Sequence, residues 1–409
     1  MRRGEPFDTA RDRALADLPD RDRRLAHELA AGVLRQQRVL DALVDSARAD
    51  PRLHDILRMG IYQLRFLDRV PAHAAVATSV ALARERAGAA PAGYVNRALR
   101  TLTRSPLPAS RVRNATHPLW LVRRWRAQFG PELADRLVAW NDTAPPLTLQ
   151  PARWDQATLA ARLTEAGIAT EPAPAGAGVR LLRRAPGLPL PAPRALPGYL
   201  EGGFVVQDGA AALVCRFAAL PLGVTVYDAC AAPGGKAVTL ETLGATVIAG
   251  DARRDRLKRL CDTVRRAGRA IRVIAADLRA APFAAARLDA VLIDAPCTAT
   301  GTMARHPDAR GRLTPRAIAR LAARQRSLLD AGAALVRPGG VLVYATCSLE
   351  PEENVEQVRD FLERHPEFSR TPVANAVPGV LVTPDGDFLS LPPRDGIDGA
   401  YAARLERRS

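Results

Sequence analysis

At residues 224–236 the chain reads Val-Thr-Val-Tyr-Asp-Ala-Cys-Ala-Ala-Pro-Gly-Gly-Lys, a buried-strand pattern that ends in an acid and continues through a turn of small residues. Small side chains and glycine let a ligand approach the backbone closely, and a following helix offers free N–H groups. A phosphate loop would need glycine in place of Cys230 and a hydroxyl in place of Ala237, and a G-x-G-x-x-G is also absent. The turn therefore predicts a ligand without a polyphosphate.

Strand and helix patterns alternate around this turn. Buried-strand patterns recur at 245–250, 271–276, 288–293 and 340–344, with a helical pattern over 257–264 among the segments between them. Such alternation is typical of an α/β domain whose mostly parallel sheet is covered by helices on both faces.

Four of these strands end in aspartate: Asp228, Asp251, Asp277 and Asp294. The carboxyl ends of parallel strands share the edge where open α/β sheets bind ligands. Asp251 suits ribose hydroxyls and Asp277 suits an adenine amine, so the expected cofactor is S-adenosylmethionine. The alternative is that such acids only cap helices.

Two cysteines lie at the same predicted edge. Cys297 follows the strand at 288–293, and Cys347 follows the strand at 340–344. A cytosine ring is not nucleophilic at C5, but thiolate addition at C6 makes it so, and a base must then remove the C5 proton before the thiol can leave. Each cysteine could instead be an inert buried thiol. Their paired positions favour covalent chemistry with a separate release step.

Composition restricts the class of protein further. The 409 residues allow two or three domains, and the net charge of +16 favours a polyanionic partner over a merely solvated basic surface. Only Lys236 and Lys258 are lysine, so a lysine in the turn stands out against an arginine background. The five cysteines include no C-x-x-C pair, which predicts a reduced protein without a metal site. No apolar run approaches ~20 residues and no signal-peptide pattern is present, so we expect a cytoplasmic protein without a membrane span.

The chain divides into three predicted segments: 1–110, 111–215 and 216–409. The first is all-helical, with helices over 25–44, 53–67, 72–87 and 94–102 and breaks at Pro71 and Pro91. The second is a small α+β segment rich in proline and glycine, and the third is the α/β domain. Three tryptophans in the second segment are flanked by arginines: Trp120, Trp125 and Trp140. Such residues can stack on nucleic-acid bases, but most tryptophans belong to a core or an interdomain contact.

Three strings in the last segment, at 228–236, 294–301 and 344–354, closely resemble the RNA cytosine-C5 methyltransferases of the Nop2/Sun class. The resemblance implies a Rossmann-like, S-adenosylmethionine-dependent methyltransferase domain. It implies that Asp251 binds the ribose, that Asp277 lies by the adenine, and that Asp294 lies where cofactor and target base meet. The turn residues expected to line the cofactor are Cys230, Ala231, Ala232, Pro233, Gly234, Gly235 and Lys236.

The resemblance also assigns roles to the thiols. It implies that Cys347 is the nucleophile and that Cys297 assists breakdown of the covalent intermediate, whereas DNA cytosine-C5 methyltransferases attack with the Pro-Cys thiol. Sequence logic alone leaves this order open.

The resemblance extends over nearly the whole chain. Residues 22–35, 60–64 and 95–100 resemble the NusB-like RNA-binding domain that precedes the catalytic region in bacterial 16S ribosomal RNA enzymes of the Sun/Fmu type, and 117–122 resembles the start of the middle region. Three departures stand out. Relative to the family, we expect most of the first NusB-like helix to be absent, Gln150-Pro151 replaces an arginine and asparagine, and 398–401 lacks the usual paired phenylalanines.

The predicted function is therefore 5-methylcytosine formation in 16S ribosomal RNA by a monomeric enzyme. Transfer RNA is the alternative substrate. A non-catalytic RNA-binding or assembly factor is the alternative class, and the intact Cys297, Cys347 and Asp294 count against it.

Overall fold

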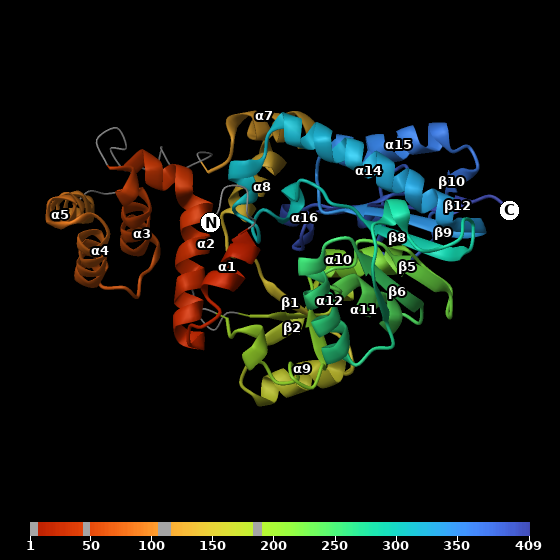
Figure 1. The fold of residues 1–409 in the computed structure, drawn as a ribbon, viewed down its shortest axis with the longest axis horizontal. Helices are drawn as coiled ribbons and strands as arrows, with labels where there is room; N and C mark the ends of the chain where they lie inside the picture. The colour runs from red at the N-terminus through yellow and green to blue at the C-terminus, as the bar shows by residue number, and fades with distance from the viewer. Residues whose placement is uncertain (1–6, 44–49, 105–115, 183–189) are drawn as a thin grey trace. The chain divides into compact units, whose positions relative to one another are not determined.

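A computed structural model describes residues 7–43, 50–104, 116–182 and 190–409. The chain divides into two compact units (Figure 1). The first comprises the described residues up to 145 together with 303–312, and the second comprises the remaining described residues. No helix within the described ranges is long and apolar enough to cross a bilayer.

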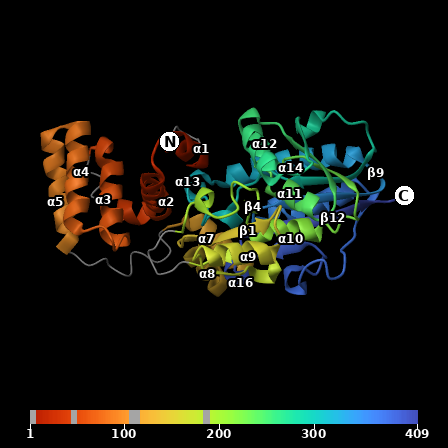
Figure 2. The same cartoon turned by 90° about the horizontal axis from the view of Figure 1, so that it is seen from below.

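The first unit is all-helical, as predicted. Its helices α2 to α5 pack in sequence around a core that includes Leu40, Leu57, Ile61 and Leu99, and Figure 2 shows α3, α4 and α5 side by side. The helices of this unit are α1 (Phe7–Ala14), α2 (Asp20–Leu43), α3 (His54–Phe66), α4 (Ala72–Ala87), α5 (Ala89–Arg104), α7 (Leu119–Phe129), α8 (Pro131–Asn141) and the short α13 (Ala309–Arg312).

One predicted helix break is wrong. Pro71 caps the N-terminus of α4, as expected, but Pro91 lies inside the first turn of α5. The first-turn N–H groups have no intrahelical partner, so a proline is tolerated there. The break falls instead at Gly88, whose φ of +99° ends α4.

Trp125 belongs to the core of the first unit and is not a stacking platform. Its side chain is fully buried, and its ring meets the buried His117 edge-on at 5.6 Å between centroids. Trp120 and Trp140 are partly exposed.

The segment 303–312 follows the Cys297 loop in the chain but belongs to the first unit. The guanidinium of the buried Arg310 pairs with Asp142 at 2.7 Å and donates to the carbonyl of Arg35 at 2.9 Å. Asp308 accepts a hydrogen bond from the backbone N–H of Phe7 at 3.1 Å.

The second unit begins at residue 146 with a small α+β part, which is only a portion of the predicted segment 111–215 because α7 and α8 belong to the first unit. Four antiparallel strands in the order β2-β3-β1-β4 carry one helix, α9 (Gln156–Glu165), over a core of Leu149, Leu159, Leu163 and Phe204. Gln150 is buried in this sheet and donates to the carbonyl of Ala177 at 2.8 Å. The strands are β1 (Leu147–Pro151), β2 (Thr170–Pro172), β3 (Val179–Leu181) and β4 (Phe204–Val206).

An eight-stranded sheet forms the rest of this unit. Five parallel strands run in the order β7-β6-β5-β8-β9, which confirms the predicted parallel sheet. Three antiparallel strands, which the sequence patterns did not reveal, complete it through β12. The strands are β5 (Thr225–Asp228), β6 (Thr246–Asp251), β7 (Arg272–Ala275), β8 (Leu288–Asp294), β9 (Val336–Thr346), β10 (Phe368–Arg370), β11 (Phe388–Ser390) and β12 (Ala400–Arg407).

Helices cover both faces of this sheet (Figure 1). On one face lie α10 (Gly209–Phe217), α11 (Gly235–Thr242) and α12 (Arg254–Ala267), and on the other α14 (Pro315–Leu335) and α15 (Val355–Arg364). Successive strand residues alternate between the two layers, so Val226 joins the first core and Tyr227 the second.

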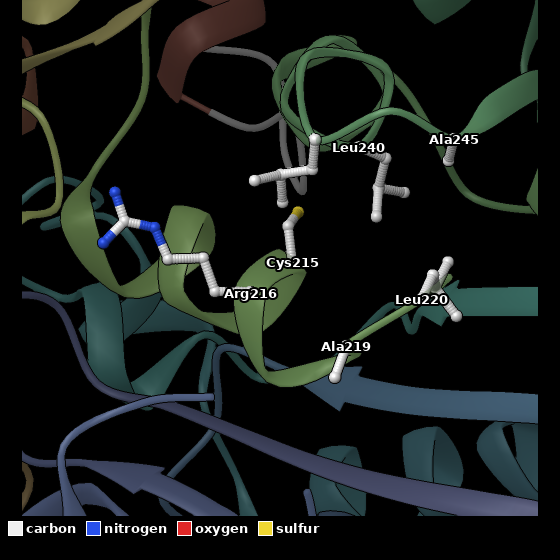
Figure 3. A pocket seen from close by; sticks show the side chains of 7 residues that line it. Cys215, Arg216, Ala219, Leu220, Leu240 and Ala245 are labelled. Atoms are coloured by element: carbon white, nitrogen blue, oxygen red, sulfur yellow. The ribbon is translucent and has the colours of Figure 1, made fainter. Parts of the chain in front are cut away.

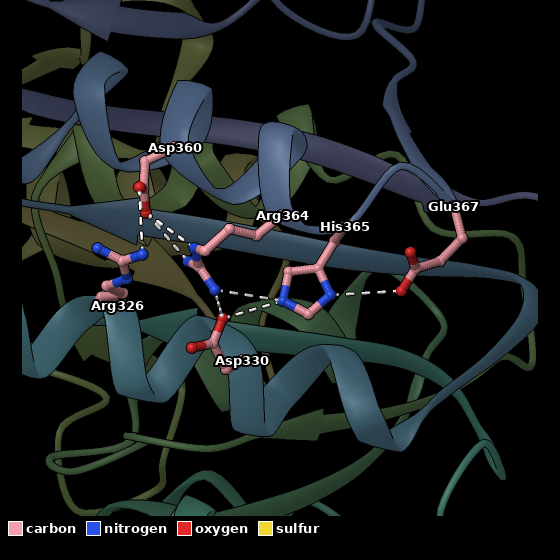
Figure 4. A network of polar contacts seen from close by, with 6 residues as sticks. All are labelled: Arg326, Asp330, Asp360, Arg364, His365 and Glu367. Carbon is pink, nitrogen blue, oxygen red and sulfur yellow. Dashed lines mark hydrogen bonds and ion pairs between the residues drawn. The ribbon is translucent and has the colours of Figure 1, made fainter.

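Polar contacts also tie α14 to α15 (Figure 4). Arg364 pairs with Asp330 and, at 3.1 Å, with Asp360, while His365 lies 3.0 Å from Asp330. The contacts of Asp330 with Arg364 and His365 hold α14 and the end of α15 together on the same face of the sheet.

Candidate active site

The turn after β5 is held by both neighbouring strands. The N–H of Ala229 donates to the carbonyl of Leu292 in β8, and the N–H of Ala231 donates to that of Gly250 in β6, both at 2.9 Å. Gly234 begins α11 with a φ of +109°, and a Cβ there would lie 2.9 Å from Leu260. Only glycine combines this backbone with this space, so the predicted residues 230–236 form a fixed small-residue edge beside the N-terminus of α11.

Lys236 connects this turn to the next strand. Its Nζ donates to Oδ2 of Asp294 at 2.8 Å, and both side chains are largely buried. Burial by itself lowers the pKa of Lys236, but the charge of Asp294 and the hydrogen bond to it outweigh burial and hold that pKa above its ordinary value. Lys236 is therefore a fixed cation.

The two aspartates predicted to bind the adenosine part of the cofactor differ in their surroundings. Asp251 is buried, with Oδ1 accepting from the N–H of Arg253 at 2.9 Å and Oδ2 lying 3.4 Å from Arg256. Asp277 caps a short 3₁₀ turn and pairs with Arg279 at 2.6 Å, which lowers its pKa to about 2. Asp277 therefore caps a helical turn, as the alternative interpretation predicts for these acids. Its contact with adenine stays a prediction.

Asp228 is a residue to which the sequence assigned no role. It is fully buried, and within the described chain neither of its carboxylate oxygens has a hydrogen-bond partner. Burial, and then the negative charge of Asp294, raise its pKa to about 7. A buried acid left without partners is costly, so this group points to a donor that a ligand supplies. The only sequence signal was its position at the end of β5.

The structure brings the two predicted thiols together. Their sulfur atoms are 3.2 Å apart, although the residues belong to loops after different strands. The N–H of Ala295 donates to the carbonyl of Ala345 at 2.8 Å, and that of Gly301 donates to the carbonyl of Cys347 at 3.0 Å. The contact with Cys347, burial, and then the charge of Glu353 hold the pKa of Cys297 well above its ordinary value. The two thiols are therefore close enough to share a hydrogen bond, in which either sulfur can be the donor.

A cavity opens onto Cys347. Its walls include Lys236 and Asp294, and also Asp208 from the start of α10 and Asp398 and Gly399 before β12. Residues 398–400, which belong to the stretch that lacks the paired phenylalanines of the family, line this cavity. The cavity places Cys347, a cation and carboxylates around one small space, as a covalent site for a polar ring requires.

A larger cavity, of about 190 Å³, lies elsewhere in this unit (Figure 3). Leu220, Leu240 and Leu243 form its walls together with Cys215. Burial raises the pKa of Cys215, which makes it a poor nucleophile. The smaller cavity is the better candidate site, because Cys347, Lys236 and Asp294 line it and the sulfur of Cys297 lies 3.2 Å from that of Cys347.

The fold and site together are those of an S-adenosylmethionine-dependent methyltransferase. Residues 221–406 match the family described as 16S rRNA methyltransferase RsmB/F, residues 2–104 match the NusB family, and residues 117–186 match the ferredoxin-like domain of RsmF/B-like methyltransferases. The chain belongs to the RsmB/F family of 16S ribosomal RNA methyltransferases.

Relatives with known names cover almost the whole chain. The ribosomal RNA small subunit methyltransferase B of Vibrio cholerae is 34% identical over 99% of this chain and 94% of its own length. The protein of the same name from Salmonella paratyphi B is 34% identical over 95% and 91%. Among solved structures, PH0851 is 25% identical with a TM-score of 0.82, covering 98% of this chain and 95% of its own. NSun6 from Pyrococcus horikoshii, 19% identical with a TM-score of 0.62 over 71% of this chain and 98% of its own, shares the fold.

Proposed function

We propose that this enzyme methylates C5 of a cytosine in 16S ribosomal RNA, with Cys347 as the nucleophile and Cys297 assisting release. The observation that carries the proposal is the 3.2 Å separation of the two sulfur atoms, beside the Lys236–Asp294 pair. Membership of a 16S ribosomal RNA methyltransferase family supports the RNA class, and the net charge of +16 suits a polyanion.

The residues present fit S-adenosylmethionine. Asp228 and Asp251 both have buried carboxylate oxygens without a hydrogen-bond partner in the described chain, and the cofactor's ammonium and ribose hydroxyls are donors. Residues 230–236 would hold its methionine part, Asp251 its ribose and Asp277 its adenine. When bound, the cofactor supplies an electrophilic methyl group.

The thiols would make C5 reactive and then release the product. Cys347 gives its thiol proton to a base in the solvent as its sulfur forms a bond to C6, which shifts the ring electrons toward C5. After C5 gains its substituent, a solvent base takes up the C5 proton, and the C–H electron pair becomes the C5–C6 double bond as the bond from C6 to sulfur breaks. Cys297, whose sulfur lies 3.2 Å from that of Cys347, would donate a hydrogen bond to the departing sulfur.

Asp294 and Lys236 would orient the reacting groups. Asp294, which lines the cavity, would accept a hydrogen bond from the cytosine edge, and its hydrogen bond with Lys236 would hold that carboxylate in place. The target base must leave its stack, at a cost of about a few kcal/mol that an unpaired loop cytosine reduces.

Methyl transfer with nucleoside analysis tests the proposal. Purified enzyme is incubated with methyl-labelled S-adenosylmethionine and unmodified 16S RNA or transfer RNA, and the RNA is digested to nucleosides. We expect labelled 5-methylcytidine from 16S RNA with the wild type and none with Cys347→Ala. Label on another atom or base would overturn the chemistry, and label on transfer RNA alone would overturn the substrate.

A further inference from the structure

The two cysteine loops share one buried carboxylate, that of Glu353. Each cysteine is followed by a hydroxyl residue, Thr298 after Cys297 and Ser348 after Cys347. Glu353 accepts from the N–H of Thr298 at 3.0 Å and from the hydroxyl of the same residue. It also accepts from the hydroxyl of Ser348 at 2.5 Å.

A third element completes the contacts of this carboxylate. Gln325, in the middle of α14 and fully buried, donates from one nitrogen to Glu353 at 3.0 Å and to the carbonyl of Pro296 at 2.9 Å. An ionised carboxylate accepts hydrogen bonds at both oxygens and donates none. It can therefore bind donors from the Cys297 loop, the Cys347 loop and α14 at the same time.

We propose that Glu353 is a positioning residue that sets the separation of the two thiols by binding the residue after each of them. The inference rests on the proposed function for its catalytic meaning. Glu353 does not line the cavity onto which Cys347 opens, so it acts through the loops.

The location of Glu353 argues against a role in stability alone. A buried carboxylate is often no more stabilising than an apolar group of similar volume, and burial raises the pKa of Glu353 despite its hydrogen bonds to Ser348, Thr298 and Gln325. Its charge also adds to the raised pKa of Cys297. This charge favours a protonated thiol at Cys297, so its removal alone would speed oxidation of that thiol, and slower disulfide formation in Glu353→Gln would report displaced thiols.

The test begins with the free enzyme and no RNA. Diamide takes two electrons and two protons from a pair of close thiols and leaves a disulfide, and peptide mapping measures the Cys297–Cys347 product over time. Because an error of about 1 Å in position can cost about a hundredfold in rate, we expect Glu353→Gln to form this disulfide at least about tenfold more slowly than wild type. Glu356→Gln, on α15, is the matched control and should match the wild type.

A second pair of variants covers the case in which Glu353→Gln fails to fold. Thr298→Val removes one donor to the carboxylate at similar volume, whereas Thr298→Ser keeps it. We expect slower disulfide formation with valine and the wild-type rate with serine. Wild-type rates in folded Glu353→Gln, or in Thr298→Val if the glutamine variant does not fold, would overturn the inference, even if the melting temperature fell.

A catalytic measurement then separates this inference from the proposed function. With 16S RNA and S-adenosylmethionine, Glu353→Gln should lower kcat by about tenfold or more and leave the KM for RNA within about twofold. A wild type that forms the disulfide rapidly yet never methylates RNA would refute the proposed function, and the disulfide rates would still decide the role of Glu353.

Discussion

The ammonium nitrogen of Lys236 lies 2.8 Å from Oδ2 of Asp294, and this contact joins the turn after β5 to the strand that leads into Cys297. The chain has only two lysines among 59 basic residues. The compact ammonium of lysine sits on a flexible stem and reaches Asp294 from the first turn of α11. The planar guanidinium of arginine differs in shape and reach, so the two residues are not interchangeable here. The pair therefore couples the predicted cofactor side of the site to the thiol side.

Loss of this cation should impair catalysis more than folding. Lys236→Met leaves Asp294 in the cavity without its partner, and removing one such fixed group typically costs about a hundredfold in kcat. Lys258→Met, at the exposed lysine of α12, should leave kcat unchanged. Steady-state methylation of 16S RNA measures both, and equal rates for Lys236→Met and wild type would contradict the role of the pair.

Asp228 should make the second unit less stable as the pH rises toward neutrality. Its pKa is raised to about 7, so between about pH 4 and 7 the folded state binds more protons than the unfolded state. The free energy of unfolding should fall across that window, by at most about 4 kcal/mol for a shift of about three pKa units.

Urea unfolding at several pH values checks this slope. Asp228→Asn should be less sensitive to pH than the wild type between about pH 5 and 7, because the amide does not titrate. Asp262→Asn, at an exposed position of α12, should keep the wild-type slope. Identical slopes for wild type and Asp228→Asn would show that Asp228 titrates normally.

A methyl group at Gly301 should distort the thiol site. A Cβ there would lie 2.3 Å from the carbonyl oxygen of Gly399, and the N–H of Gly301 donates to the carbonyl of Cys347. Gly301→Ala should therefore lower kcat by about tenfold or more, since small displacements of reacting groups are costly.

Gly311→Ala is its control, because a Cβ at Gly311 meets nothing within 4 Å. Methylation rates compared at equal folded fraction, from circular dichroism, distinguish the two substitutions. If both variants were equally active, the close approach of Gly301 to Gly399 would have no bearing on the site.

The buried ion pair of the first unit should be sensitive to loss of its cation. Arg310→Ala leaves Asp142 without its buried partner and should destabilise the first unit by about 3–5 kcal/mol. Arg126→Ala breaks a pair with Asp135 whose side chains are each more than two-fifths exposed, and should cost no more than about 1 kcal/mol. Urea unfolding of the full chain, followed by helical circular dichroism, should show a shifted transition for Arg310→Ala alone.

Local patterns predicted much of this fold because they act over short stretches of chain. The helix predicted over 72–87 coincides with α4, and the five parallel strands lie within a few residues of their predicted positions. Strand-ending residues could be placed at one edge because a parallel sheet aligns the carboxyl ends of its strands, so Asp294, Cys297 and Cys347 could be grouped in advance.

Local sequence patterns could not predict contacts between residues that are far apart in the chain. The pairing of β12 with β9 joins residues more than fifty positions apart, and Arg310 pairs with Asp142, which lies 168 positions earlier in the chain. Glu353 was part of a quoted motif, yet its role depends on Thr298 and Gln325, which only the folded chain brings to it.

The order of action of the two thiols is the central claim, and trapping the covalent intermediate tests it most directly. Cys297→Ala and Cys347→Ala are each incubated with S-adenosylmethionine and 16S RNA, denatured, and run on a denaturing gel with labelled RNA. Without Cys297 the bond between Cys347 and C6 should form but break slowly, so a protein–RNA adduct should accumulate. Cys347→Ala should give none. An adduct with Cys347→Ala and none with Cys297→Ala would contradict the assignment.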